Sequence, residues 1–520
     1  MFNNFKDQTM INDVQNISGN RNPDRKEPKK WKNFALLLGP IMFCVLQFVE
    51  PPKTLSPEAF EILSVAIWMA IWWVSEAVPI AVTALLPIVL FPLTGALTLE
   101  STTPSYGHKY VFLYIGGFIL ALAIERWQLH RRIALNILNI VGSKVKYIIL
   151  GFMVSTAFLS MWISNTATAV MMLPIGVAII KQFGAKTSKK REKKLGRALM
   201  LSIAYSASIG GFASLIGTPP NLVLAGVIEE LYGVKISFMQ WMQFALPVSI
   251  LLLFLCWIYL TKFAFKISDE VFPGGHKEIK SMLKDLGKIS YEEKAVLIVF
   301  ILTALAWVFR SFIQIFIPII DDTIIATIAA ITLFMISAKS SNRRLLLWSE
   351  AVKLPWGIIL LFGGGMALAK GFTDTGLADW IAAQFSYLKG MELFFLMLIL
   401  VAAVNFLTEI TSNLATTAML LPVLAPIAFS MGIHPYMIMV AATLAASCAF
   451  MLPVATPPNA VVFGSGYLKI SSMVKVGVVM NIVSILIVTL ITYFLLPYLW
   501  DIDKFHFPQV FRQFMDTPNL

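Results

Sequence analysis

The sequence has little charge. Lys, Arg, Asp and Glu make up 13% of its 520 residues, whereas a soluble chain is typically about one quarter charged. Hydrophobic residues make up 58% of the chain, and its mean hydropathy is +0.77. This composition excludes a disordered protein, and a cytosolic enzyme would leave much of this apolar surface in water. The sequence therefore indicates a protein that spans a membrane several times.

Cysteine is also scarce. The three cysteines, Cys44, Cys256 and Cys448, lie in apolar stretches. Their spacing matches neither a disulfide framework nor a metal site. This excludes a disulfide-stapled secreted scaffold, and we expect all three side chains to lie in the protein core.

Basic residues outnumber acidic ones, 41 against 29, which gives a net charge of +12. In a soluble protein this excess would suggest a nucleic-acid partner. In a membrane protein, however, Lys and Arg collect in cytoplasmic loops. Here they are frequent in residues 1–32, 128–146, 181–197 and 339–353. We therefore expect no nucleic-acid partner and place these four segments, with the N-terminus, in the cytoplasm.

Apolar segments with few or no charges predict membrane spans, because a helix needs about 20 apolar residues to cross a bilayer. Nine segments come close to this length: 33–49, 59–75, 77–99, 109–127, 236–261, 295–309, 323–338, 354–369 and 476–500. Three other charge-free runs, 147–180, 198–228 and 410–468, have polar, helix-breaking residues near their middles. Broken backbone at membrane depth survives only against protein or water. These runs therefore predict re-entrant hairpins and broken helices.

The expected fold is an all-α polytopic membrane protein with about 11 transmembrane helices and two re-entrant helical hairpins. Residues 262–294, which link the two halves of the chain, contain both basic and acidic residues. This segment predicts an amphipathic helix at the inner membrane surface. The chain is expected to begin with a cytoplasmic basic tail (1–32) and to end with an extracellular C-terminal tail (501–520). The first half (33–261) contains spans 1–6 and a hairpin at about 135–182 that enters from the cytoplasm. The cytoplasmic linker (262–294) leads to the second half (295–500), which contains spans 7–11 and a hairpin at about 390–430 that enters from outside.

The chain contains an internal repeat. Residues 164–174 (SNTATAVMMLP) match residues 412–422 (SNLATTAMLLP) at seven of eleven positions without a gap. Residues 217–221 (GTPPN) then match 455–459 (ATPPN). With the expected topology the two halves are inverted in the membrane, as in many secondary transporters.

The Ser-Asn motif in each half predicts the tip of a helical hairpin. Ser, Asn and Thr are weak in helix interiors and strong as N-caps. The second arm of such a hairpin begins with free N–H groups and a partial positive charge, which suits a carboxylate. The alternative is that these polar residues only hold helices together, but two symmetric copies favour a binding site.

The Thr-Pro-Pro-Asn motif predicts a break in a second helix of each half. Two successive prolines supply no N–H, so upstream carbonyl groups lose their helical partners. Such carbonyls, with nearby hydroxyl and amide oxygens, suit a cation such as Na⁺. A simple proline kink is the alternative. Because the three charge-free runs contain no Lys or Arg, helix ends and bound cations would have to balance an anionic substrate, which favours a sodium symporter.

Other candidate residues are less informative. Glu409 lies four residues before Asn413, one helical turn away, where it could orient the hairpin or hold a proton. Glu76 and Lys370 are expected to brace helix ends, although charged groups in a membrane are functional candidates. No HExxH or Walker pattern is present, so we expect no enzyme activity and no cofactor, with Na⁺ as the coupling ion.

The paired motifs resemble those of the divalent anion/sodium symporter family, and the resemblance extends from about residue 35 to residue 500. It is closest to bacterial sodium-dependent dicarboxylate transporters. It implies a homodimer in the plasma membrane, with scaffold and transport domains that work by an elevator motion. The implied function is Na⁺-coupled symport of C4-dicarboxylates (succinate, malate and fumarate) into the cell. The alternative is a sodium-independent dicarboxylate exchanger on the same fold.

The resemblance also implies site residues. The first sodium site uses Ser160, Ser164, Asn165 and the carbonyl of Gly217. The second uses Thr408, Thr411, Asn413 and the carbonyl of Ala455. The implied substrate-binding residues are Asn165, Thr166, Thr218, Pro219, Asn413, Thr456 and Pro457.

One position departs from the usual bacterial motif. Leu414 stands where a threonine is usual and lacks its hydroxyl. The substrate pocket is therefore expected to be asymmetric. In the alternative, Leu414 only packs against the scaffold and does not meet the substrate.

Overall fold

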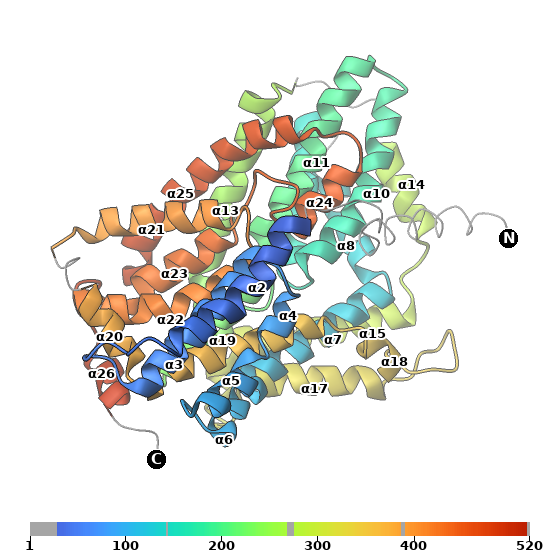
Figure 1. The fold of residues 1–520 in the computed structure, drawn as a ribbon. Helices are drawn as coiled ribbons and strands as arrows, with labels where there is room; N and C mark the ends of the chain where they lie inside the picture. The colour runs from blue at the N-terminus through green and yellow to red at the C-terminus, as the bar shows by residue number, and fades with distance from the viewer. Residues whose placement is uncertain (1–28, 142–143, 268–274, 386–389, 517–520) are drawn as a thin grey trace.

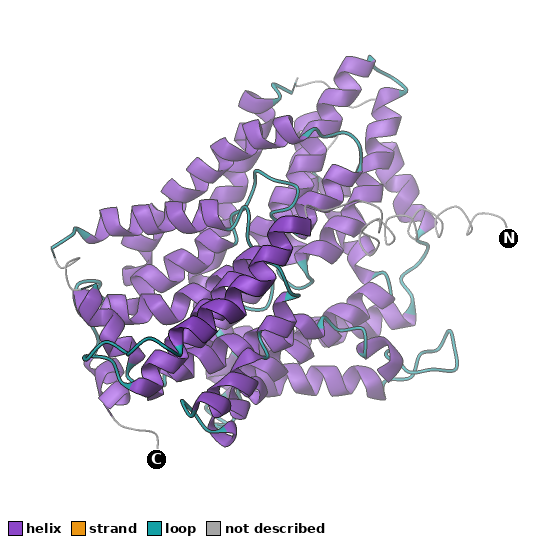
Figure 2. Cartoon of the chain, in the orientation of Figure 1, coloured by secondary structure: helices purple, strands orange, loops and turns teal. Residues whose placement is uncertain are grey.

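The computed structural model describes residues 29–141, 144–267, 275–385 and 390–516. Figure 2 shows these residues as helices joined by loops. Seven of the described helices are long and apolar enough to cross a membrane, and several shorter apolar helices accompany them. An all-helical fold with several apolar helices is thus confirmed. The exact number of spans stays a prediction.

One group of helices comes from the first and middle parts of the chain. Its members are α2 (Lys29–Leu46), α3 (Pro57–Ser75), α4 (Ile80–Thr83), α5 (Leu86–Thr94), α6 (Leu99–Thr102), the 3₁₀ helix η1 (Thr103–Gly107), α7 (Lys109–Arg126), α15 (Tyr291–Val308), α16 (Arg310–Ile313), α17 (Asp322–Met335), α18 (Trp348–Ala351) and α19 (Trp356–Asp374). Within this group α7 packs along α17, and α19 packs against η1 and α4. In Figure 1 helices α5, α6, α17 and α18 of this group lie at the bottom of the molecule, and α2 crosses its centre.

The second group contains the repeated segments. Its first-half members are α8 (Leu129–Ile140), α9 (Val145–Ser160), α10 (Asn165–Gly184), α11 (Lys189–Gly211), α12 (Pro219–Tyr232), α13 (Phe238–Ile258) and the π-helix η2 (Tyr259–Ala264). Its second-half members are α20 (Leu377–Gln384), α21 (Leu393–Leu407), α22 (Asn413–Met431), α23 (Pro435–Ala446), α24 (Pro457–Gly464) and α25 (Ile470–Trp500). The order α8–α12 repeats as α20–α24. The structure therefore repeats at the same places as the sequence motifs.

Two shorter helices complete the fold, α14 (Gly275–Asp285) and α26 (Gln509–Asp516). Helix α14 lies in the predicted 262–294 linker and packs against α8. Residues 268–274 of that linker lie outside the described residues, as do residues 1–28 of the predicted N-terminal tail and 517–520 of the C-terminal tail.

The two groups of helices meet along α19. This helix packs against α12 from the first half and α22 from the second half. Three successive glycines, 363–365, lie on it, and a Cβ at Gly365 would lie 3.0 Å from the Cβ of Ala418 on α22. The absence of side chains at these positions allows α19 to approach its neighbours closely.

Two sequence expectations need correction. The segment 77–99 is not one continuous helix, because Pro79 precedes α4, Pro87 lies in the first turn of α5, and Gly95 ends α5 with φ of +76°. Prolines start helices but interrupt their interiors. The fold therefore divides this segment into two short helices.

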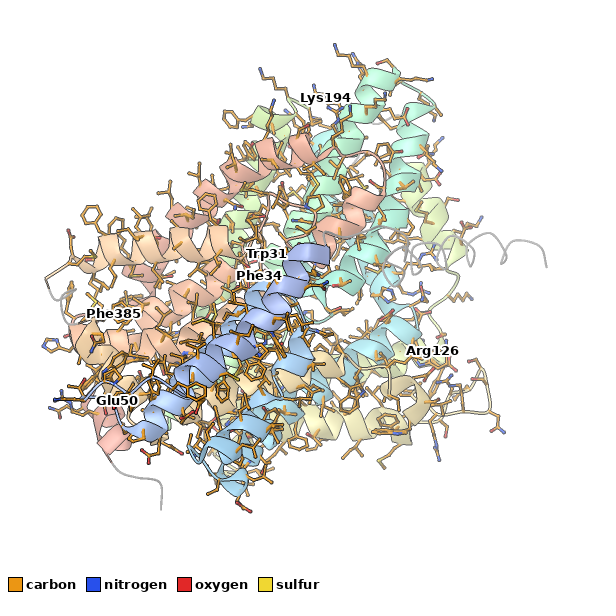
Figure 3. All side chains as sticks on the ribbon, in the orientation of Figure 1. Trp31, Phe34, Glu50, Arg126, Lys194 and Phe385 are labelled. Carbon is orange, nitrogen blue, oxygen red and sulfur yellow. The ribbon has the colours of Figure 1, made fainter. Side chains whose placement is uncertain are left out.

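The second correction concerns the cysteines. Cys256 and Cys448 are buried as expected, but Cys44 is exposed on α2. Helix α2 also exposes large apolar side chains such as Trp31 and Phe34 (Figure 3). In a membrane protein an apolar side chain faces either the core or lipid, and hydropathy alone does not distinguish the two.

Candidate functional site

The first Ser-Asn motif forms the turn between α9 and α10. Ser164 is the N-cap of α10, and its hydroxyl accepts a hydrogen bond of 3.3 Å from the N–H of Ala167. Serine is favoured there because the first N–H groups of a helix have no partner within the helix. The positive end of the α10 dipole is therefore located at this tip.

Three oxygen atoms meet behind the first tip. The Ser160 hydroxyl lies 2.6 Å from Oδ1 of Asn165 and 2.7 Å from the carbonyl oxygen of Ala207 on α11. Both neighbours are acceptors, and a hydroxyl has only one proton to donate. The cluster therefore has more oxygen lone pairs than protons.

Further carbonyl oxygens face Gly217 in the break between α11 and α12. A Cβ at Gly217 would lie 2.8 Å from the carbonyl oxygen of Ser160 and 3.0 Å from that of Met161, and it would clash with the carbonyl oxygen of Gly211. Only glycine fits so close to three backbone oxygens. Neutral oxygens of this kind are typical ligands of hard cations.

The second motif forms an equivalent cluster. The Thr408 hydroxyl lies 2.6 Å from Oδ1 of Asn413 and 2.9 Å from the carbonyl oxygen of Ala446 on α23. Thr408 occupies the position of Ser160 in the repeat, and Ala455 that of Gly217. The two hairpin tips thus have the same hydroxyl, amide and carbonyl arrangement.

Thr411, predicted for the second sodium site, makes different contacts from Ser164, predicted for the first. Its hydroxyl lies 2.8 Å from the carbonyl oxygen of Leu407 and 2.7 Å from the hydroxyl of Thr416. In the repeat Thr411 aligns with Ile163, and Ser164 aligns with Ser412. Of the four residues predicted for the second sodium site, the contacts bring together Thr408 and Asn413, whereas Thr411 pairs elsewhere.

The Thr-Pro-Pro-Asn motifs start the helices that follow the breaks. Thr218 is the N-cap of α12 and Thr456 that of α24, with Pro219 and Pro457 as their first helical residues. Both threonines are buried; Pro219 is half-buried and Pro457 exposed. The backbone leaves helical geometry where two prolines remove its donors.

The asparagine of each Thr-Pro-Pro-Asn motif donates hydrogen bonds to carbonyl groups of the break that precedes it. The Asn221 side chain donates to the carbonyl oxygens of Phe212 and Ser214, at 3.2 and 2.7 Å. Asn459 donates to those of Ala449 and Leu452, at 3.2 and 3.0 Å. Both asparagines are fully buried, and their side-chain oxygens have no partner among the described residues.

The two halves interlock around these breaks. Helix α10 packs along α24, and α22 packs along α12, so each hairpin arm lies against the post-break helix of the other half. In Figure 1 the arm pairs approach the centre from different sides, α10 from the upper right and α21 and α22 from the left. Helices that carry motifs far apart in the sequence therefore contact each other.

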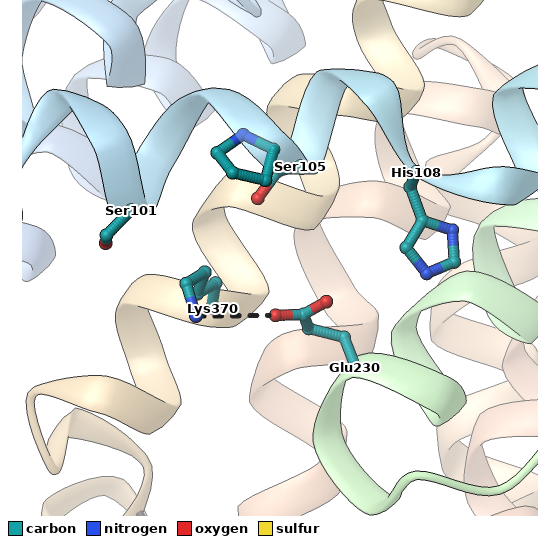
Figure 4. A pocket seen from close by; sticks show the side chains of 6 residues that line it. Ser101, Ser105, His108, Glu230 and Lys370 are labelled. Atoms are coloured by element: carbon teal, nitrogen blue, oxygen red, sulfur yellow. Dashed lines mark ion pairs between the residues drawn. The ribbon is translucent and has the colours of Figure 1, made fainter. Parts of the chain in front are cut away.

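A cavity of about 290 Å³ lies elsewhere, lined by Ser101, Pro104, Ser105, His108, Glu230 and Lys370 (Figure 4). Nζ of Lys370 lies 3.0 Å from Asp374 and 3.9 Å from Glu230. These contacts agree with the expectation that Lys370 braces a helix end. Glu76 is the C-cap of α3 in left-handed conformation. None of the residues predicted for the sodium or substrate sites lines this cavity.

Glu409 is not one helical turn before Asn413. Helix α21 ends at Leu407 and α22 begins at Asn413, so Glu409 lies in the tip turn between them. The polar residues that favour the tip also end the helix there. The carboxylate is buried and points to the break that follows α23 rather than along α22.

Several contributors to the clusters were not predicted. The carbonyl groups of Ala207, Gly211 and Ala446 join them through tertiary packing, which no local sequence pattern marks. Asn221 and Asn459 belong to the repeated motif and could have been found from their equivalent positions. Asn481 on α25 was also missed, although an asparagine within a long apolar run is a usable signal.

Comparison with known proteins places the chain among transporters. A family model described as the sodium:sulfate symporter transmembrane region matches residues 29–500. The chain belongs to this family. Two relatives are named sodium-dependent dicarboxylate transporter SdcS. The one from Staphylococcus saprophyticus is 44% identical over 492 residues, which cover 92% of this chain and 95% of that protein.

The second relative, from Staphylococcus aureus strain USA300, is 43% identical over 491 residues, covering 91% of this chain and 94% of that protein. Two solved structures share the fold. MtrF of Neisseria gonorrhoeae has a TM-score of 0.53 at 11% identity and covers 93% of this chain and 97% of its own. The YdaH transporter of Alcanivorax borkumensis has a TM-score of 0.54 at 12% identity, covering 77% and 88%.

Proposed function

We propose that this chain is a Na⁺-coupled symporter that carries C4-dicarboxylates such as succinate, malate and fumarate into the cell. The observation that carries the proposal is the pair of equivalent oxygen clusters at the hairpin tips. Each cluster offers neutral oxygens to a cation beside the N-terminus of a helix, which suits a carboxylate. The names of the two staphylococcal relatives support the same substrate class.

In this proposal, Na⁺ at each cluster holds the tip and helps to neutralise the dianion. The first cluster contributes Ser160, Asn165 and the Gly217 region, and the second Thr408, Asn413 and the Ala455 region. The substrate carboxylates bind between the tips, at Asn165, Asn413 and the buried Thr218 and Thr456. No cationic side chain is needed, because helix ends and two bound cations provide the positive charge.

The proposed mechanism moves the second group of helices as a transport domain against the first group as a scaffold. The packing supports this division, because each hairpin interlocks with the other half of its own group, whereas α19 connects the two groups. We place the protein in the plasma membrane as a homodimer, with the N-terminus cytoplasmic and the C-terminus extracellular. Cysteine labelling at each terminus and light scattering of the detergent-solubilised protein test these assignments.

Two other transport functions compete with the proposal. A sodium-independent exchanger would use the same fold but would not need the two cation clusters. The family description also names sulfate, which is a divalent anion like the dicarboxylates. Sulfate is a single tetrahedral anion, whereas succinate has two separate carboxylates, one for each of the two equivalent hairpin tips.

The test is uptake of labelled succinate into proteoliposomes. We expect uptake with an inward Na⁺ gradient and little with an inward K⁺ gradient, and competition by malate and fumarate stronger than by sulfate. Uptake that needs internal dicarboxylate instead of Na⁺ would favour the exchanger. Competition by sulfate alone would overturn the dicarboxylate assignment.

A further inference from the structure

The Glu409 carboxylate is surrounded by hydrogen-bond donors. Its Oε1 accepts from the backbone N–H groups of Phe450 and Met451, at 2.7 and 2.9 Å, and its Oε2 accepts from that of Leu452 at 3.0 Å. The side-chain amide of Asn481 on α25 donates to Oε1 at 2.8 Å. An ionised carboxylate is an acceptor only, and here every partner is a donor.

The three backbone donors belong to the break between α23 and α24. Successive N–H groups that converge on one anion form a nest. These residues lie outside α23 and α24, and Glu409, together with Asn459, holds the backbone of the break in place. Asn481 also accepts from the Phe450 N–H, at 3.2 Å, which connects the nest to α25.

This carboxylate lies beside the second oxygen cluster. Glu409 follows Thr408, whose hydroxyl contacts Asn413 and the carbonyl oxygen of Ala446. Ala446 is the last residue of α23, directly before the break that Glu409 holds. The position of the break therefore affects both the shape of the cluster and its electrostatic potential.

The charge of Glu409 is poorly screened. Its residue is 2% exposed, and α21, α24 and the break between α23 and α24 contain no Lys or Arg. A negative charge close to a cation site in a low-dielectric interior attracts the cation strongly. Backbone dipoles stabilise the carboxylate but leave its net charge in place.

The first half lacks this arrangement. Met161 occupies the position of Glu409 in the repeat. There the Ser214 hydroxyl donates to the carbonyl oxygen of Met161, and Trp241 donates to that of Phe212 at 2.9 Å. These contacts of the first break involve neutral groups, whereas the second break also donates its N–H groups to a carboxylate.

We propose that Glu409 is a positioning residue that sets the cation affinity of the second site, both by holding the break after α23 and by its negative charge. The two cation sites are therefore unequal, and the second one binds Na⁺ more tightly. The inference rests on the proposed function, since it takes the two oxygen clusters as Na⁺ sites.

The test measures Na⁺ binding without transport. Purified wild-type protein and the variant Glu409→Gln are melted across a Na⁺ titration, with choline keeping ionic strength constant. We expect the Na⁺ concentration at half-maximal stabilisation to rise about tenfold in Glu409→Gln. The control is the same substitution at Glu392, an exposed glutamate directly before α21: Glu392→Gln is expected to leave the Na⁺ midpoint within about twofold of wild type. An unchanged Na⁺ midpoint in Glu409→Gln would overturn the proposal.

A second variant, Glu409→Asp, keeps the proposal testable if Glu409→Gln does not fold. Glu409→Asp keeps the charge but is one methylene shorter and cannot reach all three N–H groups. We expect a smaller rise in its Na⁺ midpoint, and a midpoint equal to that of wild type would overturn the proposal. If wild type shows Na⁺ stabilisation but no dicarboxylate uptake, the proposed function fails while the Glu409 assignment stands.

Discussion

At the residue scale, the account depends on two hydroxyl–asparagine pairs, Ser160 with Asn165 and Thr408 with Asn413. Each asparagine begins a hairpin arm, and its side-chain oxygen faces a hydroxyl at 2.6 Å. Among the described residues the amide nitrogen of the same side chain has no hydrogen-bond acceptor, so it can donate to an anion. One residue type can therefore meet both a cation and a carboxylate.

We expect Asn165→Ala and Asn413→Ala each to reduce Na⁺-driven succinate uptake at least about tenfold, since hydrogen bonds to charged groups contribute about 1.5–3 kcal/mol. Uptake into proteoliposomes with matched protein content measures this. Asn136→Ala is the control, because Asn136 lies exposed on α8 and donates to the carbonyl oxygen of Arg132 in its own helix. Normal uptake by either site variant would remove that asparagine from the site.

Leu414 tests the asymmetry of the two tips. Leu414 is 6% exposed and belongs to the apolar core, whereas Thr166, its first-half equivalent, is half-buried. This burial favours the packing alternative. We therefore expect Leu414→Thr to lower the melting temperature, at a cost of about 1–3 kcal/mol for burying a hydroxyl, and to leave the order of succinate, malate and citrate uptake unchanged. Several-fold tighter succinate binding would instead place Leu414 at the substrate.

At the element scale, the two broken helices bring backbone oxygens to the hairpin tips. The sequence predicted both breaks because prolines and polar residues interrupt apolar runs. It did not predict the division of 77–99 or the outward position of Cys44. It also missed the donors around Glu409, which come from segments about 40 and about 70 residues away in the chain and are brought together only by folding.

Gly217 and Ala455 occupy equivalent positions in the repeat, but only Ala455 has a Cβ atom. A Cβ at Gly217 would meet three carbonyl oxygens, so we expect Gly217→Ala to reduce Na⁺-driven uptake about tenfold, in line with about 1–3 kcal/mol for overpacking. The matched variant Ala455→Gly removes a methyl group, and we expect it to keep most of the uptake. Equal activity of both variants would contradict a tight oxygen cluster at Gly217.

The start of α23 is sensitive to acid. His434 is its N-cap, and Nδ1 accepts a hydrogen bond of 3.3 Å from the N–H of Tyr436. Burial lowers the pKa of His434 from 6.5 to about 4. The unfolded chain thus binds a proton at higher pH than the folded chain does. Stability is therefore retained above about pH 6.5 and lost as the pH falls from there toward 4.

This pH dependence is measured by melting the purified protein between pH 7 and pH 4.5. We expect His434→Gln to lose less stability over this interval than wild type, by on the order of 2 kcal/mol. His506→Gln is the control, because His506 is exposed near the C-terminus. Equal acid sensitivity in wild type and His434→Gln would contradict the assignment.

At the scale of the whole molecule, two repeats of one hairpin-and-break unit interlock. Their crossed packing, α10 with α24 and α22 with α12, places elements of both halves around one region. The repeat and its motifs could be predicted from sequence alone. Which carbonyls face each tip could not, because that depends on how the two halves pack.

The central claim is that Na⁺ and the dicarboxylate bind at the same pair of tips, so that each increases the affinity for the other. The most direct measurement is the succinate dissociation constant of purified protein by calorimetry, over a series of Na⁺ concentrations at constant ionic strength. The account predicts that this constant falls by about 5- to 150-fold as Na⁺ replaces K⁺. The same succinate affinity in Na⁺ and in K⁺ would contradict it.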